Sequence, residues 1–357
     1  MPILVKLKQS PISLLMIFVI VTKIVAFLYL FNLNYIEPYG RLTPDKWWLV
    51  FHRWDSAFYD RIASFGYVDL KHWAFLPAFP AMIKAFMVLI GNSAVATVVA
   101  GLFSGVLWIP IYYKTATKYM NQKLALNSTL LFLFFPTVYL FTSVGYTEGL
   151  WLTTTIAGWY LYMRGKHFSS SIALAISTLT RVPGIILPAI ISLRFLTQRR
   201  IRMAFVYSLS LVFLIAWICY GFFDTGELIA PLAAQQKTVW NSHLNFIELF
   251  LMRLVNSSPS TWSTRDVFVI LMLSLFLYLS LKVFSVDKTL GVYSISLFVF
   301  YLFSANFLSL PRYLPCTFPI WLGIREEKKS VTLVYVIFNF LLALILWSQF
   351  LNDGWVG

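Results

Sequence analysis

The stretch PISLLMIFVIVTKIVAFLYLFNL, residues 11–33, decides the fold class, because it is a largely apolar run of 23 residues. A helix of about 20 such residues crosses roughly 30 Å of hydrocarbon. The run is too long for the core of a signal peptide, and no small-residue cleavage site follows it. We therefore expect it to be a retained membrane anchor.

The whole chain has the composition of a membrane protein. Of its 357 residues, 59% are apolar and only 12% are charged, whereas soluble domains carry charge on roughly a quarter of their residues. This composition excludes an ordinary soluble domain, a coiled coil, collagen and a disordered chain. Cys219 and Cys316 form no CxxC motif and both lie in apolar stretches, so we expect packing roles for them. The sequence predicts an all-α polytopic membrane protein.

Further membrane helices are expected near residues 93–113, 124–143, 149–163, 203–222, 267–281, 290–308 and 331–350. Three other stretches are harder to assign. Residues 75–90 are short and proline-containing, which is typical of a re-entrant or interfacial helix. Residues 169–193 contain Arg181 and Pro183, which predict two half-length helices meeting at a break, and residues 313–324 are short for a crossing. We expect one integral-membrane domain over residues 1–357, a bundle of about nine to eleven membrane helices, some of them broken.

We attribute the net charge of +14 to basic residues that set the orientation of the chain in the membrane. Lys and Arg cluster at residues 6–8, 114–123, 164–166, 194–202, 282–288 and 325–329, and such clusters mark the cytoplasmic face. Attraction to anionic lipid headgroups explains most of this charge, so no nucleic-acid partner is predicted. Residues 34–74 and 223–265 then become two large external loops.

The remaining polar residues gather at external membrane boundaries. They comprise His52, Arg53, Trp54, Asp55, Asp60, Arg61, His72, Tyr146, Thr147, Glu148, Arg312, Tyr313 and Asp353, and Arg181 lies within a span. Ionisable groups at such depths are costly and usually face a cavity in which they pair or act. We expect a cleft on the outer side, reached from both water and lipid.

Simpler interpretations exist for each of these residues. Asp55 precedes an amphipathic segment and is equally suited to capping a helix. Glu148 is suited to a helix start, and Arg312 to an anchor that reaches the membrane surface. Asp60 lies five residues after Asp55, so the two need not form a dyad, and Arg53 or Arg61 is its expected partner. Arg181 needs a counter-ion, either a phosphate or a carboxylate.

Motifs for several enzyme classes are absent. The sequence contains no Walker A run, HExxH, GxSxG or GxGxxG, so it offers no motif for nucleotide hydrolysis, zinc proteolysis or serine hydrolysis. It also contains no cluster typical of a metal site.

Several motifs resemble one known family. RWDSAFYDRIASFGY (residues 53–67) followed by HWAFLPAFP (72–80) resembles the external loop of the GPI mannosyltransferase II (PIG-V-type) family, which belongs to the GT-C membrane glycosyltransferases. FP at 135–136, YTE at 146–148, TRVPG at 180–184 and PRY at 311–313 resemble later family elements in the same order. Two positions differ: Lys71 precedes the loop histidine where an acid is common, and Gly149 follows Glu148 where a small hydroxyl residue is common.

The resemblance implies a GT-C-like bundle with a catalytic first external loop. It also implies transfer of a mannosyl group from polyprenyl (dolichyl) phosphate mannose to a lipid-linked glycan acceptor at the external or lumenal face. That face belongs to the ER membrane in a eukaryote and to the cell membrane in a prokaryote. The resemblance does not specify which glycan or glycolipid is the acceptor. It also leaves open whether glucose replaces mannose as the donor sugar and whether a small membrane subunit is a partner.

An inverting transfer needs one base and a cationic site for the departing phosphate. We expect Asp55 to be the general base and Arg181 and Arg312 to bind the donor phosphate. The residues expected to contact the acceptor or support Asp55 are Arg53, Trp54, Tyr59, Asp60, His72, Tyr146 and Glu148. No cofactor is predicted, and arginines replace a metal ion at the leaving phosphate. A transporter or flippase for a lipid-linked or anionic solute is the alternative function, and a non-catalytic scaffold is a third.

Overall fold

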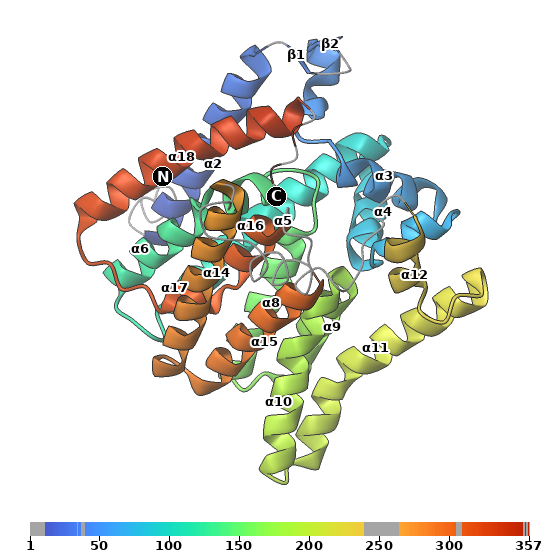
Figure 1. The fold of residues 1–357 in the computed structure, drawn as a ribbon, viewed down its shortest axis with the longest axis vertical. Coiled ribbons are helices and arrows are strands. Elements are labelled where there is room, and N and C mark those ends of the chain that lie inside the picture. The colour runs from blue at the N-terminus through green and yellow to red at the C-terminus, as the bar shows by residue number, and fades with distance from the viewer. Residues whose placement is uncertain are drawn as a thin grey trace, which may run out of the picture.

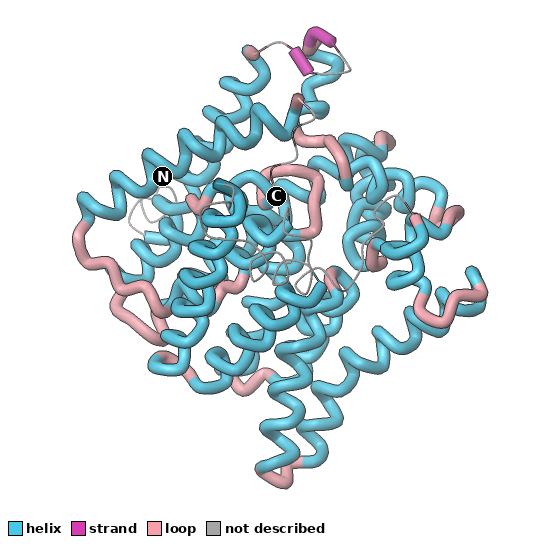
Figure 2. The backbone as a smooth tube through the Cα atoms, viewed as in Figure 1, coloured by secondary structure: helices cyan, strands magenta, loops and turns pink. Residues whose placement is uncertain are grey.

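The computed structural model describes residues 11–33, 35–36, 40–238, 264–304, 309–352, 354 and 356. Figure 2 shows that the described chain is mostly helical, with short connecting loops. Its single sheet in this part pairs two short antiparallel strands, β1 (Tyr35–Ile36) and β2 (Gly40–Arg41). The predicted all-α class is confirmed.

Five described helices are long and apolar enough to cross a membrane. They are α2 (Pro11–Asn32), α5 (Ser93–Ala116), α11 (Ile201–Thr225), α14 (Thr264–Lys282) and α18 (Lys329–Leu351). Shorter helices fill the bundle: α4 (Ala78–Ile90), α6 (Gln122–Leu133), α8 (Glu148–Met163), α9 (His167–Thr180), α10 (Ile186–Thr197) and α15 (Lys288–Ser304). The chain is a multi-pass membrane protein, and the number of full crossings stays a prediction.

Prolines set the breaks between the shorter helices. The single helix predicted over residues 124–143 is wrong: α6 ends at Leu133, and α7 (Pro136–Phe141) begins at a proline, which has no backbone N–H to donate to the preceding turn. The predicted break at Arg181 is confirmed, since a short 3₁₀ turn, η3 (Val182–Ile185), separates α9 from α10. Residues 310–322 likewise form three short pieces that each contain a proline: α16 (Leu310–Tyr313), η7 (Leu314–Cys316) and α17 (Pro319–Leu322).

The first predicted external loop is itself folded. After β2 it contains η1 (Pro44–Val50), α3 (Asp55–Phe65) and η2 (Leu70–Ala74). Within the second predicted loop, residues 223–265, α11 continues to Thr225, and α12 (Ala230–Lys237) follows and packs against η2. Residues 239–263 of that loop lie outside the described part of the chain, as do Lys6 and Lys8 of the first basic cluster.

The core that positions the first loop is built around α5, α8 and α9, which pack side by side (Figure 1). Contact between α5 and α8 is very close: a Cβ atom on Gly149 would lie 2.5 Å from the backbone nitrogen of Gly105. A hydroxyl residue therefore does not fit at position 149 in this chain, where a glycine stands instead.

Helix α18 contacts the first loop on both sides of residue 52. The Trp347 indole N–H donates to the Val50 carbonyl at 2.9 Å, and the Trp54 indole N–H donates to the Phe350 carbonyl at 3.2 Å. These two hydrogen bonds hold the segment that leads into α3 against the bundle.

Candidate active site

Asp55 is the first residue of α3 and does not cap it. The capping position is taken by Trp54, whose side chain makes no cap hydrogen bond and whose backbone has a φ of 52°. This conformation is rare for a bulky residue and is typically retained at functional sites. The Asp55 backbone N–H donates to the Tyr146 hydroxyl at 3.1 Å. This hydrogen bond fixes the start of α3 to the segment before α8.

The Asp55 carboxylate faces a cation and stays partly accessible. Its Oδ2 accepts a hydrogen bond from Arg312 Nη1 at 3.2 Å, and 19% of the side chain is exposed. Burial raises the pKa of Asp55 above its ordinary value, although the Arg312 guanidinium opposes this rise. The result is a carboxylate that is more basic than a free aspartate and is still reachable from outside.

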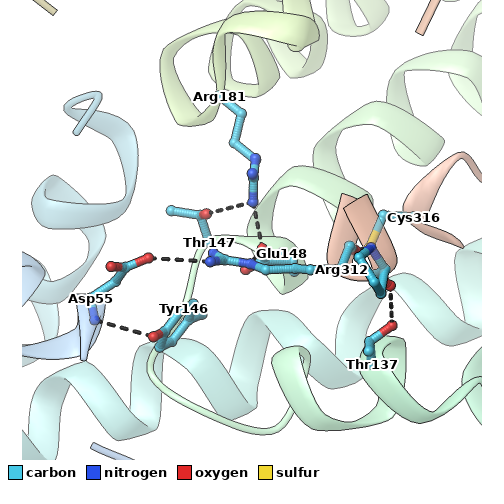
Figure 3. Close-up of polar contacts among 9 residues, drawn as sticks. Asp55, Thr137, Tyr146, Thr147, Glu148, Arg181, Arg312 and Cys316 are labelled. Atoms are coloured by element: carbon cyan, nitrogen blue, oxygen red, sulfur yellow. Dashed lines mark hydrogen bonds and ion pairs between the residues drawn. The ribbon is translucent and has the colours of Figure 1, made fainter. Parts of the chain in front are cut away.

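Glu148, the first residue of α8, links two arginines (Figure 3). Its Oε1 accepts hydrogen bonds from Arg181 Nη1 and from Arg312 Nε. Arg181 also donates to the Thr147 hydroxyl at 3.4 Å. Asp55, Arg312, Glu148 and Arg181 thus form one continuous chain of alternating charge.

Aromatic rings enclose both guanidinium groups. The Arg312 guanidinium lies 4.6 Å from the ring centres of Phe141 and Tyr146, and that of Arg181 lies 4.4 Å from the ring centre of Tyr313. Arg312 is only 3% exposed, whereas Arg181 is 14% exposed. The interpretation of Arg312 as an anchor reaching the membrane surface is therefore wrong, because its guanidinium is paired inside the protein.

Tyr59 and Tyr146 support this centre from the side. Tyr59 is buried, with its ring 6.5 Å from the ring of Tyr146 and in edge contact with Phe75 and Phe79. Tyr146 is fully buried as well. Buried rings are not available to stack on a sugar, so both tyrosines act as packing and hydrogen-bonding supports.

Trp54 and Arg53 flank Asp55 on the loop side. Trp54 is exposed, with its indole N–H held by the Phe350 carbonyl. Arg53 is buried. Of the two, Trp54 presents a ring to the outside next to Asp55.

Asp60 and His72 belong to other contacts. Asp60 Oδ2 lies 3.3 Å from His52 Nε2, a partner that the sequence analysis did not name. His72 is fully buried, and its Nδ1 accepts a hydrogen bond from the Asp69 backbone N–H at 3.3 Å. The structure places neither residue in the chain of charges that contains Asp55.

The sequence analysis named Tyr313 without giving it a role, and it did not single out Lys23. Tyr313, which follows Arg312, covers Arg181. Lys23 of α2 is buried and donates to the Thr142 carbonyl at 3.3 Å and to the Ser143 hydroxyl. A signal for Lys23 was present, since it is the only charged residue in the apolar run 11–33.

The arrangement suits acid–base chemistry beside an anion. The partly exposed carboxylate of Asp55 can accept a proton. The guanidinium of Arg181, the less buried of the two, can bind an anionic group of a ligand. Among the described residues, no group of three or more His, Cys, Asp or Glu side chains is arranged to hold a metal ion.

Comparisons with known proteins identify the family. A family model described as mannosyltransferase (PIG-V) matches residues 43–270, which include Asp55, Glu148 and Arg181. GPI mannosyltransferase 2 of Schizosaccharomyces pombe is 25% identical over 171 residues, covering 45% of this chain and 36% of that protein. The match therefore spans little more than a third of that relative.

The fold is shared with a solved GT-C enzyme. ArnT from Cupriavidus metallidurans, in a structure bound to undecaprenyl phosphate, superposes with a TM-score of 0.53 at 14% identity, covering 92% of this chain and 63% of that one. Its apo structure gives 0.54 at 16% identity, covering 91% and 63%. The expected GT-C-like bundle is confirmed, and the match over residues 43–270 shows that the chain belongs to the mannosyltransferase (PIG-V) family.

Proposed function

We propose that the protein transfers a mannosyl group, with inversion, from polyprenyl-phosphate mannose to a lipid-linked glycan acceptor. The observation that carries this proposal is the Asp55 carboxylate, partly exposed at the start of α3 and 3.2 Å from Arg312, which in turn is linked through Glu148 to the more exposed Arg181. A partly exposed carboxylate, linked in this way to a partly exposed guanidinium, supports the roles of base for Asp55 and phosphate ligand for Arg181.

In the proposed reaction, the acceptor hydroxyl oxygen attacks the anomeric carbon of the donor sugar. Asp55 takes the hydroxyl proton as the new carbon–oxygen bond forms. The bond from the anomeric carbon to the phosphate oxygen breaks, and the polyprenyl phosphate leaves with the electron pair. The raised pKa of Asp55, caused mainly by burial, makes it a better proton acceptor than an ordinary aspartate.

The two arginines contribute unequally to binding of the leaving phosphate. Arg181 is the more accessible, and a guanidinium fork matches phosphate oxygens. Arg312 is buried and hydrogen-bonded to both carboxylates, so it adds positive charge behind Arg181 and orients Asp55. Because both lie in a weakly hydrated site, their stabilisation of developing negative charge exceeds its value in water. We expect no metal ion to be required.

The proposed face is the non-cytosolic one, in the ER membrane of a eukaryote or the cell membrane of a prokaryote. Asp55 lies in the folded loop after α2, on the side opposite to the basic clusters in the predicted topology. Support for a lipid-phosphate donor comes from the GT-C neighbour, ArnT, whose structure contains undecaprenyl phosphate.

The test is transfer by purified full-length protein in liposomes. The donor is labelled dolichyl-phosphate mannose, and the acceptors are GPI precursor lipids and polyprenyl-diphosphate oligosaccharides. Asp55→Asn should lower transfer by at least about 100-fold while folding is retained. Glu227→Gln is the matched control, because Glu227 forms an exposed ion pair with Lys237 on another part of the chain.

Wild-type transfer by Asp55→Asn would overturn the assignment of the base. Passage of the labelled lipid between leaflets without formation of any glycosidic product would indicate the transporter or flippase instead.

A further inference from the structure

Glu148 has an unusual position for a carboxylate. Its side chain is 1% exposed, and Oε1 alone accepts the bonds from both arginines. The second oxygen, Oε2, is buried and has no hydrogen-bond partner among the described residues. Retaining a charged group in this way is costly, so a contribution beyond packing is expected.

The effect of Glu148 on its neighbours follows from the charges. Asp55 and Glu148 provide two negative charges, and Arg181 and Arg312 provide two positive ones. If Glu148 were neutral, Asp55 would face two guanidinium groups with no competing carboxylate. An opposing charge at hydrogen-bonding distance stabilises the ionised form of an acid and makes it a weaker base.

We propose that Glu148 is a positioning residue that divides Arg312 between two carboxylates and so keeps this arginine from neutralising Asp55. The inference rests on the proposed function, since it concerns the base of that reaction. Through the same oxygen, Glu148 also holds Arg181 beneath the ring of Tyr313, where its guanidinium stays partly neutralised until a donor phosphate arrives.

The charged and titratable groups that face Asp55 agree with this assignment. They are Glu148 at the start of α8, Arg181 at the end of α9, Arg312 of α16, Tyr59 of α3 itself and Tyr146 in the segment before α8. Burial makes the largest contribution to the raised pKa of Asp55, Arg312 lowers it, and Glu148 raises it. Removal of the Glu148 charge should therefore lower the pKa of Asp55.

Glu148→Gln tests the proposal, because it removes the charge and keeps the shape and one oxygen. We expect kcat to fall by about tenfold or more, since Asp55 becomes a weaker base. The acidic limb of the pH–kcat profile should move to lower pH. KM for dolichyl-phosphate mannose should fall by roughly tenfold, because Arg181 is no longer neutralised by a carboxylate.

This combination separates positioning from support of the fold. Loss of a merely structural contact would lower the amount of active protein without moving the pH limb or tightening the donor. Glu148→Asp, which restores the charge, should return the limb and KM towards wild type. Glu227→Gln, at an ion pair outside the site, should change none of these values.

The double variant Glu148→Gln/Arg181→Gln removes one charge of each sign and serves if the single variant fails to fold. It loses donor affinity, and its pH limb should move downward by less than in Glu148→Gln, because loss of Arg181 raises the pKa of Asp55 and so opposes the larger effect of losing Glu148. An unmoved limb in whichever variant folds overturns the proposal. Asp55→Asn distinguishes this failure from that of the proposed function, because loss of transfer in Asp55→Asn with an unmoved limb in the Glu148 variant rejects only the assignment of Glu148.

Discussion

Gly149→Ala should misplace Glu148 by a distance that the structure allows to be worked out. A Cβ atom at position 149 would lie 2.5 Å from the Gly105 nitrogen and 2.7 Å from its Cα, both of them backbone atoms that cannot rotate away. To restore an ordinary contact of 3.4 Å, α8 and α5 must separate by about 0.9 Å at this point. Because Glu148 is the preceding residue, its carboxylate moves with the helix.

The expected loss of transfer follows from that shift. A misplacement of about 1 Å in catalytic geometry costs roughly 100-fold in rate, and overpacking of this kind destabilises by about 1–3 kcal/mol. The assay is kcat/KM for mannosyl transfer in liposomes, together with thermal unfolding in detergent. Gly323→Ala is the control, because a Cβ there would have only the Ile320 carbonyl at 3.2 Å as a close neighbour. Wild-type transfer and stability in Gly149→Ala would refute the reasoning.

The remaining predictions concern pH, metal and the fixing of the first loop. Activity should fall as the pH decreases through the raised pKa of Asp55, so the acidic limb should lie above the value of about 3.9 for a free aspartate; a limb at or below that value in a pH–rate profile would contradict it. The contribution of Asp55 to stability should be complete below the unfolded-state pKa and lost as pH rises through the folded-state pKa, which unfolding midpoints of wild type and Asp55→Asn at several pH values would reveal. Prolonged treatment with EDTA should leave mannosyl transfer unchanged, and restoration of a lost rate by added Mn²⁺ or Mg²⁺ would argue for a metal. Trp347→Phe should lower the free energy of unfolding by about 1–3 kcal/mol, because it leaves the Val50 carbonyl without its donor; an unchanged unfolding midpoint would contradict this.

Local signals in the sequence predicted much of the helix arrangement. Pro183, two residues after Arg181, marks the break between α9 and α10. The prolines at 311, 315 and 319 mark the short pieces near Arg312. The break before Pro136 was overlooked because the apolar run continues through it. An apolar run indicates insertion into a membrane. Whether the helix continues through that run also depends on prolines, which have no backbone N–H to donate.

The composition of the site was easier to predict than its connections. Asp55, Glu148, Arg181 and Arg312 were each singled out by motif and depth, yet Arg312 pairs with a residue 257 positions away and with another 164 positions away. Sequence spacing carries no information on such pairings. It also cannot show that one oxygen of Glu148 serves two arginines, or that His52 meets Asp60.

The hydrogen bonds from α18 to the first loop join residues that are synthesised far apart in time. The loop is translated early, but the residues that fasten it, Trp347 and Phe350, are translated nearly 300 positions later, as their separations of 297 and 296 residues from Val50 and Trp54 show. Arg312 also emerges long after Asp55. A nascent chain halted before residue 312 contains the Asp55 carboxylate without its partner Arg312, so the proposed catalytic centre is complete only when the distant helices have been synthesised and inserted.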